Sequence, residues 1–275
     1  MEKGFIKKRL EFYKIARDIK KIKIQGARNI AKKALYAYYL IPTKKAKKKL
    51  MSLRPTEPML VNVLNRTETQ SYEEILKHFD SAQEKINKIV FRLIKNNEII
   101  YTHCHSTNVS YSLIYAKNNS KKFEVYNTET RPLFQGRKTA QELSDAKIKV
   151  TMFIDSALSI ALSKKQGTKS VTKIFLGADA LLKDGIINKI GSGLIAQIAK
   201  NQKIPVYIIA DSWKFTTKAI KIEQRNLNEI WDNAPKKVKI QNPAFEFVDK
   251  KYITGIVSEL GLLNYDNFVK KMMKE

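Results

Sequence analysis

The chain has 275 residues, and its 52 Lys and Arg against 26 Asp and Glu give a formal net charge of +26. An apolar share of 43% is enough to bury a core and excludes a disordered chain, while 10 Gly and 7 Pro exclude collagen-like and low-complexity classes. The basic residues, 43 Lys and 9 Arg, are scattered rather than gathered in a nucleic-acid-binding motif. We therefore expect a solvated basic surface that attracts small anions, and no specific nucleic-acid binding.

The first hundred residues carry the periodicity of helices. Apolar residues recur at three- and four-residue spacing, which is typical of helices packed on one face. The predicted helices cover, in chain order, residues 12–22, 23–39, 44–51, 56–64 and 70–97. Thr56 is expected to cap the fourth, and Glu73 and Glu74 suit the N-terminal end of the fifth. These segments predict an all-helical N-terminal domain over residues 1–96.

From residue 98 the period changes to that of strands alternating with helices. Short apolar runs predict strands at 98–102, 123–127, 149–154, 172–176 and 205–210. Helices are predicted between them at 107–117, 138–146, 156–165 and 192–202. This alternation favours βαβ units and a parallel, doubly wound sheet. The predicted fold class is α/β, with a Rossmann-like parallel sheet domain over residues 97–275 after the helical domain.

The residues that follow the predicted strands are polar, and in such sheets a ligand lies beyond the carboxyl ends of the strands. These residues are 103–106, 128–131, 155–156, 177–179 and 211–212. We expect them to line one site.

Two of these residues are suited to acid–base chemistry. Cys104 precedes a predicted helix N-terminus, where a thiolate is favoured, although a lone cysteine is also commonly a buried structural residue. Asp155 ends an apolar strand, and burial among apolar residues favours a protonated carboxyl group that can donate a proton. Asp155 is equally suited to cap the next helix.

A metal site is not predicted. His103 and His105 flank Cys104, but adjacent residues of an extended segment point to opposite sides and no second ligand cluster exists. Arg54, Arg131, Lys189 and Lys214 are candidate anion-holding residues, or solvated charges.

A glycine-containing turn at residues 191–196 has the spacing of a dinucleotide-binding motif. The strand expected in front of it, residues 185–188, is short and polar-ended, so a phosphate-binding or structural turn is favoured and no cofactor is predicted. The lone cysteine excludes an internal disulfide, and neither a signal peptide nor an apolar run of about 18 residues is found. We therefore expect a cytoplasmic protein without a membrane span.

Taken together, several segments resemble one family. It contains the regulatory α, β and δ subunits of translation initiation factor 2B, the methylthioribose-1-phosphate isomerases and the archaeal ribose-1,5-bisphosphate isomerases, and the last branch is the most similar. The matching stretches are residues 24–28, 54–56, 102–106, 129–136, 154–157, 177–179, 187–191, 210–215, 242–245 and 256–261.

The resemblance implies roles for individual residues. Cys104 would be the proton acceptor and Asp155 the proton donor of an isomerase. The residues implied in substrate and phosphate binding are Gln25, Gly26, Ala27, Arg28, Arg54, Ser106, Arg131, Gln135, Asn188, Lys189 and Lys214. Gln25 stands where the family has Arg, so Arg28 would have to replace that contact.

Three functions follow from the resemblance. The first is an aldose–ketose isomerase that converts ribose 1,5-bisphosphate to ribulose 1,5-bisphosphate in nucleoside or AMP salvage, without cofactor or metal. The second is a non-catalytic regulatory subunit that binds the α subunit of initiation factor 2. The third is a methylthioribose-1-phosphate isomerase. A homo-oligomer, either a dimer or a hexamer, is also implied.

Overall fold

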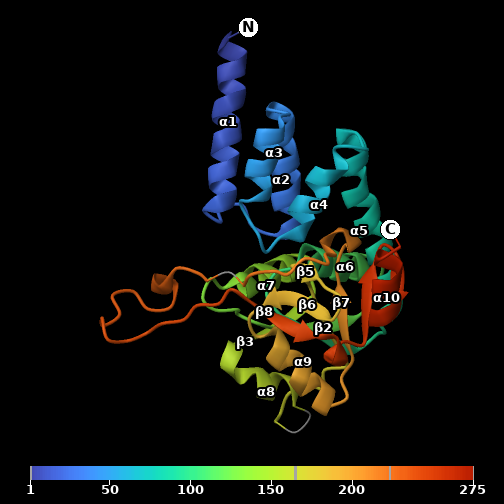
Figure 1. Cartoon of the computed structure of the whole chain (residues 1–275). Helices are drawn as coiled ribbons and strands as arrows, with labels where there is room; N and C mark the ends of the chain where they lie inside the picture. Colours follow the sequence, from blue (N-terminus) through green and yellow to red (C-terminus); the bar gives the residue numbers. More distant parts are fainter. Residues whose placement is uncertain (1, 164–165, 223, 275) are drawn as a thin grey trace.

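The structure is a computed structural model that describes residues 2–163, 166–222 and 224–274. Five helices come first (Figure 1): α1 (Glu2–Lys20), α2 (Ala27–Leu40), α3 (Lys44–Met51), α4 (Pro58–Arg66) and α5 (Tyr72–Leu93). The five predicted helices are confirmed, although several ends differ: α1 begins ten residues earlier, α2 begins four residues later, and α5 ends four residues earlier than predicted. Helix α4 begins at Pro58 with Glu57 as its N-cap, so Thr56 does not cap it. Helix α5 begins after a capping box formed by Ser71 and Glu74.

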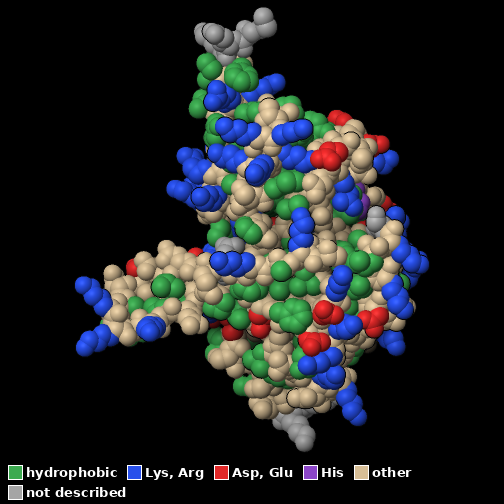
Figure 2. Space-filling view, viewed as in Figure 1, with side chains coloured by type: hydrophobic (Ala, Val, Ile, Leu, Met, Phe, Trp, Pro, Cys, Tyr) green, Lys and Arg blue, Asp and Glu red, His purple; other side chains and the backbone are tan. Residues whose placement is uncertain are grey.

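The N-terminal helices bury two apolar clusters. One joins α1, α2, α3 and α4 through residues such as Phe12, Ile30 and Leu60. The other joins α2, α4 and α5 and includes Trp213, which comes from the opposite half of the chain. Lys and Arg side chains cover much of the outer surface of these helices, as expected for a solvated basic surface (Figure 2).

The α/β part is built on a seven-stranded sheet of order β10-β9-β7-β4-β1-β2-β3. All neighbouring pairs are parallel except β9 and β10. The strands are β1 (Glu98–Thr102), β2 (Phe123–Thr128), β3 (Lys149–Phe153), β4 (Lys173–Leu176), β7 (Val206–Ile209), β9 (Gly255–Ser258) and β10 (Gly261–Leu263). The fold class predicted from the sequence, a Rossmann-like parallel sheet after a helical segment, is therefore confirmed.

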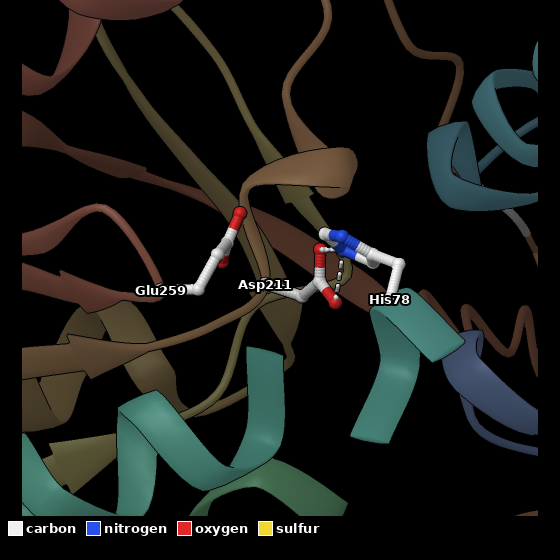
Figure 3. Close-up of side chains that lie close together, drawn as sticks. All are labelled: His78, Asp211 and Glu259. Carbon is white, nitrogen blue, oxygen red and sulfur yellow. Dashed lines mark hydrogen bonds and ion pairs between the residues drawn. The ribbon is translucent and has the colours of Figure 1, made fainter. Parts of the chain in front are cut away.

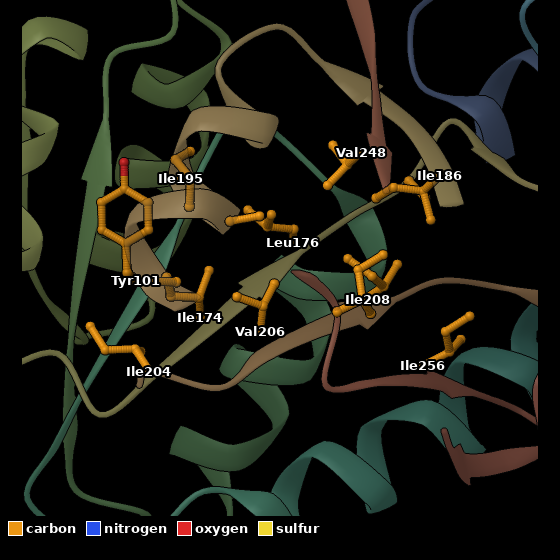
Figure 4. Close-up of a cluster of buried hydrophobic side chains, with 14 of the residues drawn as sticks. Tyr101, Ile174, Leu176, Ile186, Ile195, Ile204, Val206, Ile208, Val248 and Ile256 are labelled. Atoms are coloured by element: carbon orange, nitrogen blue, oxygen red, sulfur yellow. The ribbon is translucent and has the colours of Figure 1, made fainter. Parts of the chain in front are cut away.

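Helices cover both faces of this sheet. Apolar residues of α5, α6 (Thr107–Asn118) and α7 (Gln135–Asp145) pack on one face against Ile100, Phe175 and Ile209. Residues of α8 (Leu158–Leu162), α9 (Ser192–Asn201) and α10 (Tyr265–Met272) pack on the other, against strand residues such as Tyr101 and Ile208 (Figure 4). Because successive side chains of a strand point to opposite faces, both cores come from the same strands. Helix α5 belongs to both parts of the molecule, and the domain boundary at residue 96 stays a prediction.

The sequence did not predict a second, smaller sheet. Its strands are β5 (Ala180–Leu181), β6 (Gly185–Lys189) and β8 (Phe245–Asp249), all antiparallel. The doubtful strand at 185–188 is therefore real. After residue 210, where no elements were predicted, the structure adds β8, β9, β10 and α10. The helix predicted at 156–165 is shorter, with a 3-10 turn (Asp155–Ala157) before α8, and residues 164–165 lie outside the described part.

Trp213 lies in the loop after β7 and holds this loop against the N-terminal helices. Its ring stacks on His78 of α5 with centroids 3.5 Å apart, and the Arg66 guanidinium lies 4.1 Å from the ring centroid on α4. The Asn62 side chain donates hydrogen bonds to the carbonyl oxygens of Trp213 and Phe215. These contacts hold the loop that carries Lys214 against α4 and α5.

We expect Trp213→Ala to lower the free energy of unfolding by about 3 kcal/mol or more, because it removes a buried aromatic ring from an apolar cluster. Urea denaturation measures the change. The matched control is Trp231→Ala, since Trp231 is 51% exposed against 8% for Trp213. The control should change stability by about 0.5 kcal/mol or less. Equal effects of the two substitutions would contradict the fastening role of Trp213.

Candidate active site

A pocket of about 380 Å³ lies where the strand order of the large sheet reverses. After β1 the chain forms β2 and β3 on one side of β1, and it then returns to form β4 on the other side. The segment that follows β1 and the segment that follows β4 therefore diverge. In open parallel sheets such a switch point is the usual place for a ligand. Residues 103–108 and 177–179 follow these strands and line the pocket, and the N-terminus of α2 closes it from the helical part.

The structure brings together all but two of the predicted site residues. Those that line the pocket are Gln25, Gly26, Ala27, Arg28, Arg54, Cys104, Ser106, Gln135, Asn188, Lys189 and Lys214. Asp155 and Arg131 do not line it. Arg131 is exposed, and its guanidinium lies 5.0 Å from the ring centroid of Phe134.

Cys104 lies at the carboxyl end of β1 in the left-handed region, with φ at 63°. Its N–H donates to Thr130 Oγ1 at 3.0 Å, and its carbonyl oxygen accepts from Thr139 Oγ1 at 2.8 Å. Burial raises the pKa of the thiol to about 12, while the nearby Lys189 ammonium acts in the opposite direction. The sequence suggested that the neighbouring helix N-terminus favours a thiolate, but the pKa of the thiol is raised. Lys189 is the group that favours the thiolate.

Asp155 has a different environment from the one expected. Its carboxylate oxygens accept hydrogen bonds from the N–H groups of Thr130 at 2.9 Å and Arg131 at 2.6 Å. The apolar residue before it, Ile154, is 59% exposed, because β3 is an edge strand. Asp155 thus fixes the 130–131 turn, and its predicted role as proton donor stays untested.

Asp179 is the acidic residue that the sequence reasoning placed at the site without giving it a role. It follows β4 across the switch point from Cys104 and lines the pocket. Its carboxylate raises the pKa of the Cys104 thiol more than that of Asp155 does, and it also raises the pKa of Lys189. The signal was present as Gly177-Ala178-Asp179 at the end of a predicted strand.

The two histidines beside Cys104 are tied to other groups. His103 Nδ1 lies 2.7 Å from Thr128 Oγ1 and its Nε2 lies 2.8 Å from the carbonyl oxygen of Ile190. Burial lowers the pKa of His103, which favours the neutral ring. His105 Nε2 contacts Glu142 Oε2 at 2.9 Å. His103 therefore links the segment after β1 to the turn before α9, and His105 links it to α7.

Cationic side chains surround the pocket. Burial lowers the pKa of Lys189, which ends β6. Lys214 Nζ donates to the carbonyl oxygen of Ala178 at 2.6 Å. Arg28 donates to the carbonyl oxygen of Phe79 at 2.9 Å and to Asp80 at 2.5 Å, so its guanidinium is already engaged. Arg54 is 5% exposed.

The N-termini of three helices lie at the pocket, and none of them has a side-chain cap. The N-cap of α2 is Gly26, with φ at 82°, and those of α6 and α7 are Ser106 and Phe134. Gly26, Ser106 and Gln135, the first residue of α7, line the pocket. Uncapped N–H groups and the helix dipole favour anions such as phosphate.

A second cluster of ionisable side chains lies outside this pocket (Figure 3). It contains His78, Asp211 and Glu259, whose ligand atoms lie within 4.8 Å of one another. No other group in the described residues has such metal-like spacing. His78 Nε2 lies 3.1 Å from Asp211 Oδ1, and Glu259 accepts hydrogen bonds from the N–H and hydroxyl of Ser212. These contacts brace the loop that carries Lys214.

The alkylation rate of Cys104 tests its environment, because the chain has one cysteine. A thiol with a pKa raised to about 12 is almost fully protonated at neutral pH. We therefore expect the rate with iodoacetamide to rise about tenfold per pH unit from pH 7 to pH 10, since the thiolate is the nucleophile. Lys189→Met should slow the reaction at fixed pH, and the exposed control Lys183→Met should not. A plateau below pH 9 would contradict this environment.

Gly177 has no room for a side chain. A Cβ there would lie 2.6 Å from Ser106 Oγ and 2.7 Å from Ser106 Cβ. We expect Gly177→Ala to displace Ser106 and cost about 1–3 kcal/mol in urea denaturation, because overpacking is destabilising. Adding Ser106→Gly removes both contacts and should restore most of the stability. Failure of the double variant to recover would mean that this contact does not set the cost.

Comparison with known proteins places this geometry in context. The sequence profile of the Initiation factor 2 subunit family matches residues 20–265. The chain is similar to the ribose 1,5-bisphosphate isomerase of Methanocaldococcus jannaschii, with 34% identity over 89% of this chain and 89% of that protein. It is also similar to the methylthioribose-1-phosphate isomerase of Fervidobacterium nodosum, with 31% identity over 92% of this chain and 82% of that protein.

Solved structures have the same fold. The crystal structure of the Pyrococcus horikoshii translation initiation factor eIF-2B superposes with a TM-score of 0.79 and 25% identity, covering 92% of this chain and 96% of that chain. Among the described residues, no helix has the length and apolar character needed to cross a membrane.

Proposed function

The chain belongs to the Initiation factor 2 subunit family, and from this membership and its pocket we propose that it converts ribose 1,5-bisphosphate to ribulose 1,5-bisphosphate. Isomerases among its relatives support an enzyme of the isomerase class that acts on a sugar phosphate. The observation that carries the proposal is one pocket that holds a thiol, a carboxylate and several cationic groups, with Cys104 and Asp179 on opposite sides of the switch point.

The chemistry needs one acid and one base. The anomeric oxygen of an aldose 1-phosphate carries phosphate, so the ring opens only when the bond from C1 to the ring oxygen breaks. Cys104 as thiolate takes the proton from C2, the C1=C2 bond forms, and Asp179 as carboxylic acid gives its proton to the leaving ring oxygen. The product of this step is an open-chain enol phosphate.

The second step reverses both proton transfers. The Asp179 carboxylate takes the proton of the C2 hydroxyl, and the Cys104 thiol gives a proton to C1, which leaves a ketone at C2 and returns the pair to its starting state. The pair needs one shared proton throughout. A buried thiol beside a carboxylate carries that proton at rest, and Lys189 stabilises the thiolate when the proton moves to Asp179.

A bisphosphate suits this pocket better than a methylthio sugar. Three uncapped helix N-termini and the cationic side chains supply more than one anion-holding position. A methylthio group would instead require an apolar end to the pocket. The alternative of a non-catalytic subunit that binds the α subunit of initiation factor 2 does not need Cys104 and Asp179 to face one pocket. A homo-oligomer, dimer or hexamer, stays a prediction.

A coupled assay on ribose 1,5-bisphosphate tests the proposal and separates the two candidate acids. We expect Cys104→Ser and Asp179→Asn each to lower kcat/KM by about 100-fold or more, the usual scale for a lost acid or base, with little change in stability. Asp155→Asn should lower it by less than about tenfold and reduce stability instead, since it changes the acceptor of two backbone N–H groups.

Two results would contradict the proposal. If Asp155→Asn abolished turnover while Asp179→Asn did not, the acid would be Asp155. Absence of turnover on both ribose 1,5-bisphosphate and methylthioribose 1-phosphate would rule out the isomerase, and binding to the α subunit of initiation factor 2 would then be measured.

A further inference from the structure

A long arm leaves the α/β part after Lys214 and returns at β8. The arm covers residues 218–243, described except for residue 223, and projects from the body in Figure 1. Apolar and basic side chains near its tip are exposed, among them Trp231 at 51%. The root of the arm, in contrast, reaches the pocket. Arg225 lines the pocket, and so do Ala244 and Phe245, which lie just beyond the arm.

The root of the arm is held together by hydrogen bonds between its two strands of chain. The Arg225 N–H donates to the carbonyl oxygen of Asn242 at 2.9 Å, and Asn242 Nδ2 donates to the carbonyl oxygen of Asn226 at 2.9 Å. Gln224 and Pro243 form an isolated β-bridge beside them. The backbone that carries Arg225 is therefore fixed, although the tip of the arm extends away from the molecule.

The Arg225 side chain is positioned as well as buried. Its side chain is 9% exposed, and Nη2 donates to Glu229 Oε1 at 2.9 Å. Nε lies 3.3 Å from both oxygens of Glu229. In the described part of the chain no acceptor is bonded to Nη1. A guanidinium presents its donors as a rigid fork, so Glu229 holds one side and orients the other.

A second cation, Lys189, lines the same pocket as Arg225 and is 5% exposed. Burial lowers the pKa of Lys189, and the positive charge of Arg225 lowers it further. Lys189 in turn interacts electrostatically with the Cys104 thiol. Two cations that share a buried space are stabilised by an anion placed between them.

We propose that Arg225 contacts the substrate directly and, with Lys189, binds the phosphate on C1. This inference rests on the proposed function for the identity of the ligand. Cys104 exchanges protons with C2 and C1, so the anion held beside Cys104 by Lys189 is the one on C1. The root of the arm is then part of the pocket wall, and the other phosphate lies with the helix N-termini.

The test uses inorganic phosphate as the probe and protection of Cys104 from iodoacetamide as the readout, so it needs no turnover. Phosphate bound between Lys189 and Arg225 should slow alkylation. For Arg225→Met the phosphate concentration that gives half protection should rise about tenfold or more, the scale of a lost charge-assisted hydrogen bond. Arg225→Lys keeps the charge without the fork and should raise it about threefold.

The matched control is Lys236→Met, which removes the same charge from the same arm at an exposed position. It should leave protection unchanged within about twofold. Circular dichroism and urea denaturation check that each variant is folded. If Arg225→Met fails to fold, the test rests on the protection of Cys104 measured in Arg225→Lys. If Arg225 only supported the arm, its substitution would change stability without changing the protection of Cys104 by phosphate.

The same variants are then assayed on ribose 1,5-bisphosphate, where Arg225→Met should raise KM by about tenfold or more. Protection unchanged in Arg225→Met would overturn the inference, whatever the turnover. Unchanged KM in an active enzyme would overturn it as well. Protection that depends on Arg225 in a protein without isomerase activity would support the anion site and leave only the proposed substrate wrong.

Discussion

The reversal of strand order between β1 and β4 is the constraint on which the pocket depends. These parallel neighbours continue in opposite directions, because β1 leads to β2 and β3 on one side and β4 leads to β7 on the other. This separation creates the pocket and places Cys104 on one side and Asp179 on the other. The buried apolar residues of these strands, such as Ile174 and Leu176, fix the positions of both ends.

The helical part completes the site because one loop is fastened to it. The loop after β7 places Trp213 between His78 and Arg66, and Asp211 of the same loop also contacts His78. Glu259, which follows β9, holds the loop from the sheet side through Ser212. Lys214 then reaches the carbonyl oxygen of Ala178, the residue before Asp179. The His78 cluster thus supports the pocket through the contact of His78 with Asp211 and of Glu259 with Ser212.

Local patterns in the sequence predicted most of the elements before residue 210, and they placed residues 103–106 and 177–179 correctly at the site. Residues 128–131, 155–156 and 211–212 were expected there as well but do not line the pocket, and local patterns did not decide the chemistry of the site. A continuous apolar run such as Ile174, Phe175 and Leu176 indicates a buried strand, and the rule of carboxyl ends then places the residues after it. The role of Asp155 could not be decided in this way. Its apolar neighbours predicted burial, but β3 is an edge strand, and that position depends on strand order rather than on local sequence.

The remaining gaps also come from long-range contacts. The pairing of β6 with β8 joins residues about 60 positions apart, so the short segment 185–189 had no local signal strong enough to predict a strand. Arg225 is held at the pocket by contacts that include its pairing with Asn242 across the arm. In a chain with 52 basic residues, composition cannot distinguish such a cation from a solvated one.

If this pocket isomerises a sugar bisphosphate, ³¹P NMR of ribose 1,5-bisphosphate incubated with the purified protein will show the conversion. We expect the signal of the C1 phosphate to shift to that of ribulose 1,5-bisphosphate while both phosphates are retained, and we expect Cys104→Ser to leave the spectrum unchanged. Release of inorganic phosphate, or a spectrum that the wild-type protein does not change, would contradict it.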